Sequence, residues 1–204
     1  MSNHFGFALS LLHSTTVEGY DSPIPDILLQ MAQYMRENEA LSQVGIFRIA
    51  PDSVENAKVK EMLNKGTFKS TSDVNAVANC LKIFFRELPR PLFPAELFSD
   101  IAECDKVRLQ FSPIHDLSQP SSAATLIKRF HEPNRSVYIW LLDFCVEVAS
   151  YSSINKMSPQ NLAIVIAPNL FSIKDVDPIV GIQISQKLVG FMYQSILWRQ
   201  SLAP

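Results

Sequence analysis

Apolar side chains recur at helical spacing along most of this 204-residue chain. The clearest pattern lies in residues 73–88, whose apolar positions fall on one side of a helix that turns by about 100° per residue. These positions are Val74, Val77, Ala78, Leu81, Phe85 and Leu88. Asp73 directly precedes them and suits the N-cap, because its carboxylate accepts bonds from free backbone N–H groups. A comparable pattern predicts a helix over residues 24–38, with Pro25 in its first turn.

The remaining apolar patterns predict more helices. They cover residues 53–65, 95–111, 124–132, 134–152, 159–167 and 177–200. Residues 134–152 are apolar nearly all round their middle, which is typical of a buried central helix. Strictly alternating β-branched runs are few, so strands are not expected. We therefore predict an all-α fold, a single multi-helix domain over residues 1–204 with its core at about residues 20–200.

Polar residues and prolines mark the ends of two of these helices. Asp52 precedes the second predicted helix and Glu55 follows three residues later, which resembles a capping box with Asp in place of Ser or Thr. Ser158 is expected to cap the helix that begins with Pro159, and Pro168 ends it because proline lacks a backbone donor.

A single arginine stands in an apolar stretch between the first two predicted helices. Residues 45–50 read G-I-F-R-I-A, and the first acidic residue after Arg48 is Asp52. One interpretation is an arginine at the edge of the core, whose stem packs while its charged head reaches water. The other is a guanidinium held out toward an anionic group. The surrounding residues alone leave both interpretations open.

The helix predicted over residues 73–88 also carries a polar stripe beside its apolar one. Lys82 and Arg86 lie on this stripe four residues apart, so both point the same way. Like charges at this spacing repel by tenths of a kcal/mol, and a purely structural helix gains nothing from them. The pair is either a plain solvated face or a surface for an acidic partner.

Charge and cysteine content narrow the classes of function. The formal net charge is −2 at pH 7, which does not favour a general nucleic-acid or anionic-membrane binder. No stretch reaches the roughly 18 apolar residues of a membrane span, so direct membrane insertion is not expected. The three cysteines form no C-x-x-C motif and fit a reducing compartment, hence a cytoplasmic location.

Motifs for self-contained catalysis are missing from the sequence. It contains no G-x-x-x-x-G-K-[ST], no G-x-G-x-x-G and no G-x-S-x-G, and its four histidines form no metal-binding pair. We therefore expect no metal site, no cofactor of its own and no enzyme with its own substrate.

Three blocks of the sequence resemble those of the Rho GTPase-activating protein (RhoGAP) domain family. The blocks are G-I-F-R at 45–48, D-V-N-A-V-A-N-C-L-K-I-F-F-R-E-L-P-R-P-L at 73–92 and N-K-M-S-P-Q-N-L-A-I-V-I-A-P-N-L at 155–170. Their order and separations match, and the resemblance covers essentially the whole chain. The family usually has Glu before G-I-F-R and Gly three residues after its Arg, where this chain has Val44 and Pro51.

The resemblance implies a helical domain that binds a Rho-family small GTPase in its GTP-bound state and speeds hydrolysis. Arg48 matches the arginine finger that the family supplies in trans. Lys82 and Arg86 match the basic pair facing the GTPase switch regions, and Asn169 matches the asparagine near the finger and the partner. GTP and Mg²⁺ would be carried by the partner, and the domain would act as a monomer.

The resemblance gives one expectation about the finger loop, and two alternatives stay open, one for Asn169 and one for the function. We expect Ile46, Phe47 and Ile49 to root the loop in the core while Arg48 projects from it. Asn169 also suits a simple cap or turn after Pro168. The alternative function is a non-catalytic module that keeps the fold and binds a GTPase or another protein without stimulating it.

Overall fold

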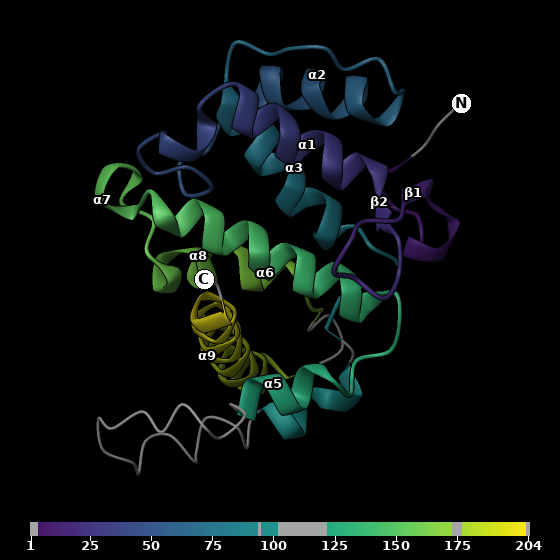
Figure 1. Cartoon of the computed structure of the whole chain (residues 1–204), viewed down its shortest axis with the longest axis vertical. Coiled ribbons are helices and arrows are strands. Elements are labelled where there is room, and N and C mark those ends of the chain that lie inside the picture. Colours follow the sequence, from purple (N-terminus) through teal and green to yellow (C-terminus); the bar gives the residue numbers. More distant parts are fainter. Residues whose placement is uncertain (1–3, 94, 102–121, 173–176, 203–204) are drawn as a thin grey trace.

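The computed structural model describes residues 4–93, 95–101, 122–172 and 177–202, and helices make up nearly all of its regular structure (Figure 1). The α-helices are α1 (Asp26–Glu37), α2 (Ser53–Asn64), α3 (Val74–Arg86), α5 (Ser122–Ile127), α6 (Asn134–Ser150), α7 (Ser152–Asn155), α8 (Pro159–Ile166) and α9 (Pro178–Leu202). The 3₁₀ turns are η1 (Leu9–Leu11), η2 (Ala40–Ser42), η3 (Ala95–Leu97) and η4 (Ala167–Asn169). The predicted all-α class is confirmed.

Several helix boundaries were predicted correctly from capping residues. The Asp73 carboxylate accepts a bond from the N–H of Asn75 at the start of α3. The Ser158 hydroxyl accepts one from the N–H of Asn161 at the start of α8, with Pro159 in the first turn. The predicted exit from helix at Pro168 is the change from α8 to η4.

Other boundaries differ from the prediction. The first helix begins at Asp26, because Ile24–Pro25 form a short strand, β2, that pairs antiparallel with β1 (Ser14–Thr15). The helix expected over residues 124–132 is the shorter α5. Of the segment predicted helical over residues 95–111, the described part consists of η3 and a helical stretch at 98–101, and the remainder lies outside the described residues.

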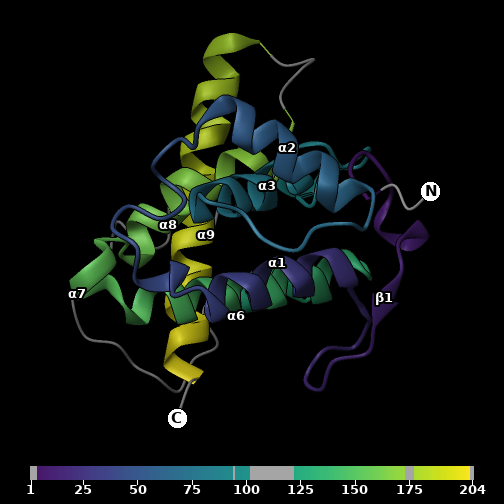
Figure 2. The same ribbon diagram turned by 90° about the horizontal axis from the view of Figure 1, so that it is seen from above.

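Helix α6 lies at the centre of the molecule, as the nearly all-round apolar middle of its sequence predicts. It contacts α8 and α9, and Figure 2 shows α9 running across it. Aromatic rings fill the space between these elements: the Tyr138 ring stacks on Phe191 at 6.1 Å and meets Phe93 edge-on at 4.9 Å. These ring contacts hold α6 rigidly against α9 and Phe93.

Helices α1, α2 and α3 form one end of the molecule, with α3 in contact with both of the others. The N-terminal segment packs against this group through Phe5, whose ring lies 6.2 Å from that of Phe84. The Asn64 side chain at the end of α2 accepts hydrogen bonds from the N–H groups of His4 and Phe5.

None of the helices in the described ranges is both long and apolar enough to cross a membrane.

Candidate functional site

Arg48 lies on a tightly wound loop, residues 43–51, which we call the Arg48 loop. It follows η2 and leads into α2. Its backbone is closed by three short-range hydrogen bonds, from Ile46 N–H to the Gln43 carbonyl at 3.1 Å and from the N–H groups of Arg48 and Ile49 to the Gly45 carbonyl, both at 2.9 Å. Residues 45–50 thus turn back on themselves and present Arg48 at the tip.

Two residues of the Arg48 loop adopt left-handed backbone angles. Gly45 has φ +73°, and a Cβ placed there would meet the Ile49 side chain at 2.9 Å, so the position needs glycine. Phe47 has φ +68° although it is not glycine, a conformation that costs about 1–2 kcal/mol. Its buried ring, which meets Phe144 edge-on at 6.2 Å, helps to hold that conformation in place.

The loop is rooted in the core by two of the three expected residues. Ile46 and Phe47 are buried, with 0% and 1% of their surfaces exposed. The expectation for Ile49 was wrong, because its side chain is 44% exposed and folds over Gly45. The tight turn at Gly45 brings Ile49 to the outside of the loop instead of into the core.

The Arg48 side chain is exposed, and it makes no hydrogen bond or ion pair with any residue that the structure describes. Its Nη2 atom lies 3.5 Å from the point where a Cβ on Gly45 would stand, so the guanidinium rests above the Gly45 backbone. A cation in this position is solvated and available to an external anion.

Lys82, in the middle of α3, binds the backbone of the Arg48 loop. Its Nζ donates a hydrogen bond to the Phe47 carbonyl at 2.6 Å, and the side chain is half-buried. Burial, followed by the nearby charge of Arg86, lowers the pKa of Lys82 below its ordinary value. The ammonium therefore fixes the peptide group that immediately precedes Arg48.

Arg86 and Asn169 differ from Lys82 in their surroundings. Arg86 is exposed in the last turn of α3 and has no partner among the described residues. The Asn169 amide donates to the carbonyls of Val165 and Ile166 at 3.1 and 3.2 Å, closing the end of α8. Since α3 contacts η4, Asn169 lies on the turn beside the helix that carries both cations.

Asn155, at the end of α7, anchors the other side of the Arg48 loop and was missed from the sequence. Its backbone carbonyl accepts a 2.8 Å bond from the Gly45 N–H. Its buried side chain donates to the carbonyls of Leu41 and Val148 at 2.7 and 2.8 Å and accepts from Met157 N–H at 2.7 Å. Its place at the start of the block 155–170 and between two helical patterns was the available signal, and neither identifies partners so distant in sequence.

The described residues contain no group of His, Cys, Asp and Glu side chains that could hold a metal ion. The two described cysteines are also unsuited to nucleophilic chemistry. Burial raises the pKa of the Cys80 thiol to about 12, and it raises that of Cys145 further still, so both remain protonated at neutral pH. What the site offers is an exposed cation on a loop that is fixed at both sides.

Comparison with known protein families matches residues 25–175 to the RhoGAP domain. The chain is 35% identical over 195 residues to Rho GTPase-activating protein gacA of Dictyostelium discoideum, which covers 93% of this chain and 52% of that protein. It is 30% identical over 174 residues to human Rho GTPase-activating protein 24, covering 82% and 23% respectively. The chain thus spans about half the length of the first relative and about a quarter of the second.

Two solved structures share the fold. Human Rho GTPase activating protein 15 superposes with a TM-score of 0.73 at 24% identity, covering 98% of this chain and 90% of that one. The BH domain from GRAF, the GTPase regulator associated with focal adhesion kinase, gives a TM-score of 0.67 at 20% identity, covering 87% and 94%.

Proposed function

This chain belongs to the RhoGAP domain family, and from that membership we propose that it binds the GTP-bound form of a Rho-family small GTPase and accelerates GTP hydrolysis. Arg48 is the catalytic residue of this proposal, inserted in trans into the active site of the GTPase. The observation that carries it is an exposed guanidinium, unpaired among the described residues, at the tip of a loop whose backbone is fixed on both sides.

The chemistry required of Arg48 is electrostatic. Charge develops on the phosphate oxygens as the γ-phosphoryl group leaves, and a planar, permanently protonated guanidinium offsets it through two parallel donors. Such an arginine contributes about 10³–10⁵ in rate. At about 1.36 kcal/mol per tenfold this amounts to roughly 4–7 kcal/mol, beyond the roughly 0–1 kcal/mol of a surface ion pair. The contact must therefore form in a site closed to water.

The other site residues would support this contact. Arg86, exposed and unpaired among the described residues, is suited to bind an acidic group on the GTPase. Lys82 would keep the Arg48 loop in place through its bond to Phe47, and the other N–H donors of its ammonium would face the partner. Asn169 retains a side-chain oxygen that can accept a bond at the interface while its amide holds the end of α8.

GTP and Mg²⁺ belong to the partner in this proposal. The domain contributes no cofactor and acts as a monomer on each GTPase molecule.

The proposal is tested by single-turnover hydrolysis, with Rho, Rac and Cdc42-type proteins each loaded with GTP. We expect the wild-type chain to raise the hydrolysis rate of at least one of them. Arg48→Ala should abolish most of the increase, by about three orders of magnitude or more, and Arg48→Lys should restore little because it lacks the planar fork. Circular dichroism and thermal melting of both variants verify that the fold persists.

The second candidate function, binding without stimulation, is favoured by Val44 and Pro51, which replace residues usual in the family. Val44 is exposed, so valine there leaves no buried group unpaired. The Asp52 carboxylate still caps α2 directly after Pro51, accepting from the N–H groups of Val54 and Glu55. A chain that binds a GTP-loaded GTPase without changing its hydrolysis rate would establish the binding function and refute the catalytic one.

A further inference from the structure

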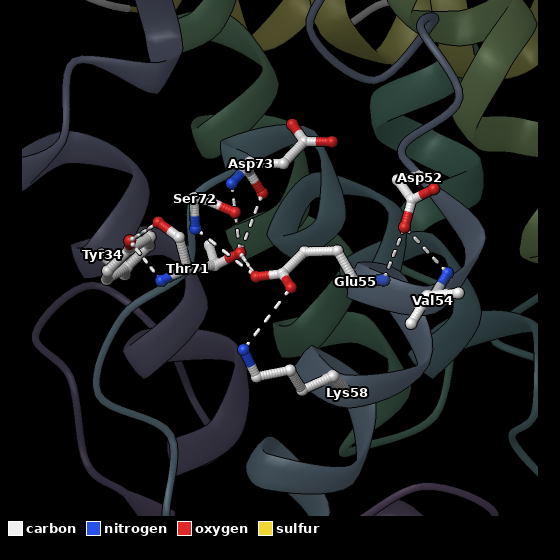
Figure 3. A network of polar contacts seen from close by, with 8 residues as sticks. All are labelled: Tyr34, Asp52, Val54, Glu55, Lys58, Thr71, Ser72 and Asp73. Atoms are coloured by element: carbon white, nitrogen blue, oxygen red, sulfur yellow. Dashed lines mark hydrogen bonds and ion pairs between the residues drawn. The ribbon is translucent and has the colours of Figure 1, made fainter.

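A polar network joins the two helices that flank the Arg48 loop (Figure 3). Its centre is Thr71, a half-buried residue in the connection between α2 and α3. On one side, the Tyr34 hydroxyl of α1 accepts a 3.0 Å bond from the Thr71 N–H and donates a 3.3 Å bond to the Thr71 carbonyl. The backbone of Thr71 is thereby tied to the end of α1 that leads into the Arg48 loop.

On the other side, the Thr71 hydroxyl donates a 2.6 Å bond to Oε1 of Glu55, in the first turn of α2. The same carboxylate accepts a 3.4 Å bond from Ser72 N–H and lies 3.6 Å from Nζ of Lys58. Glu55 was expected to complete a capping box with Asp52. Asp52 does cap the helix, but the Glu55 side chain points to Thr71, as Figure 3 shows.

The Thr71 hydroxyl also reaches the third helix of this group. It accepts a 3.2 Å bond from the N–H of Asp73, the N-cap of α3. Helix α3 carries Lys82, whose Nζ holds the Phe47 carbonyl of the Arg48 loop. Thr71 therefore ties the end of α1 through its backbone and the starts of α2 and α3 through its hydroxyl. These three helices together carry or contact the loop.

From this geometry we infer that Thr71 is a positioning residue, a clamp that fixes the helices on either side of the Arg48 loop and thereby holds Arg48 in the geometry required for catalysis. Helices α1 and α2 are connected through residues 38–52, and this segment includes the two left-handed residues of the loop. The positions of its two ends limit the paths that this segment can take. The part of this inference that concerns hydrolysis rests on the proposed function, and the part that concerns loop order does not.

Two substitutions cut the clamp at different points. Thr71→Val keeps the shape of the side chain but removes the bonds to Glu55 and Asp73, and Thr71→Ser retains the hydroxyl. Tyr34→Phe removes only the two hydrogen bonds between α1 and the Thr71 backbone. The phenylalanine ring can keep the edge-on contact with Phe68 at 4.9 Å. Thr67→Val is the matched control: Thr67 lies in the same connection and is exposed, and within the described part of the chain its hydroxyl bonds only to the Met62 carbonyl.

The first measurement is hydrogen exchange of the Arg48 loop in the isolated protein, read on the amides of Arg48 and Ile49. Thr71→Val and Tyr34→Phe should each speed this exchange severalfold, whereas Thr71→Ser and Thr67→Val should match the wild type. The second is single-turnover hydrolysis at saturating domain concentration. Here Thr71→Val and Tyr34→Phe should lower the maximal rate by roughly 10- to 100-fold, since displacing a catalytic group by about 1 Å can cost 10²-fold in rate. The half-saturation concentration should change little.

The inference would be overturned if Thr71→Val and Tyr34→Phe lowered the melting temperature while loop exchange and maximal rate stayed at wild-type values. That outcome would make Thr71 a purely structural residue. If the wild-type chain stimulates no GTPase, the proposed function fails, and the exchange measurement alone then decides whether the clamp exists.

Discussion

Removing the ammonium of Lys82 tests how the Arg48 loop is held. In Lys82→Met the side chain keeps most of its length, so its packing against the loop is retained while the 2.6 Å bond to the Phe47 carbonyl is lost. A hydrogen bond from a charged donor contributes about 1.5–3 kcal/mol. Phe47 stands in a left-handed conformation that costs about 1–2 kcal/mol, so the freed loop gains by relaxing away from the geometry that presents Arg48.

The expected loss of rate follows from these magnitudes. If the lost bond lowers the stability of the competent loop by about 1.5–3 kcal/mol, the maximal rate falls by roughly 10- to 150-fold. The resemblance to the RhoGAP family predicts in addition a raised half-saturation concentration, because Lys82 matches a residue that faces the GTPase. The contact with Phe47 adds the effect on the maximal rate, which a purely interfacial lysine would not show.

The assay is single-turnover GTP hydrolysis over a range of domain concentrations, which separates the maximal rate from half-saturation. Arg86→Met is the matched control, since Arg86 lies one turn further along α3 and is unpaired among the described residues. It should raise half-saturation with little change in maximal rate. An unchanged maximal rate in Lys82→Met, with only half-saturation raised, would refute the loop-holding role of Lys82.

Three further substitutions test the support of the loop and its surroundings. Gly45→Ala should lower both the melting temperature and the maximal rate, because the new Cβ would stand 2.9 Å from Ile49 and the φ of +73° costs about 1–2 kcal/mol for alanine; unchanged melting and activity would contradict this. Asn155→Ala should lower the free energy of unfolding by about 3 kcal/mol or more, since it leaves buried backbone groups unpaired. A loss of less than about 1 kcal/mol in chemical denaturation would contradict the anchoring role of Asn155. The hydrogen bond from the Thr71 hydroxyl is the main cause that lowers the pKa of Glu55 below the ordinary 4.5. The Glu55 carboxylate therefore stabilises the fold at neutral pH, and this contribution is lost as the pH falls through the lowered pKa of the folded state. Glu55→Gln should therefore melt below the wild type at pH 7, with the difference shrinking in acid; a difference independent of pH would show that the charge of Glu55 is not involved.

Much of the fold could be predicted because its signals are local. The apolar stripe of α3, the apolar middle of α6 and the caps at Asp73 and Ser158 depend on residues a few positions apart. The strand Ile24–Pro25 carries no such signal, since a two-residue strand has no period and exists only through its pairing with Ser14–Thr15.

The sequence predicted which residues of the Arg48 loop are exposed or buried better than it predicted their contacts. The exposure of Arg48 and the burial of Ile46 agree with the sequence-based expectations. The position of Ile49 and the bond from Lys82 to Phe47 depend on left-handed turns at Gly45 and Phe47, and nothing in the sequence specifies such a turn at a phenylalanine. Asn155 binds the Leu41 carbonyl, and Thr71 binds the side chains of Tyr34 and Glu55. These partners are distant in sequence, so both anchors become recognisable only once the helices are placed.

The central claim is that Arg48 leaves its own domain to complete the active site of another protein. The most direct test is a crystal structure of this chain with the GTPase it stimulates, trapped with GDP, Mg²⁺ and a planar mimic of the transferred γ-phosphoryl group. We predict that the Arg48 guanidinium contacts the mimic while Lys82 Nζ remains bound to the Phe47 carbonyl. A complex in which Arg48 still rests above Gly45, away from the nucleotide, would contradict the proposed mechanism.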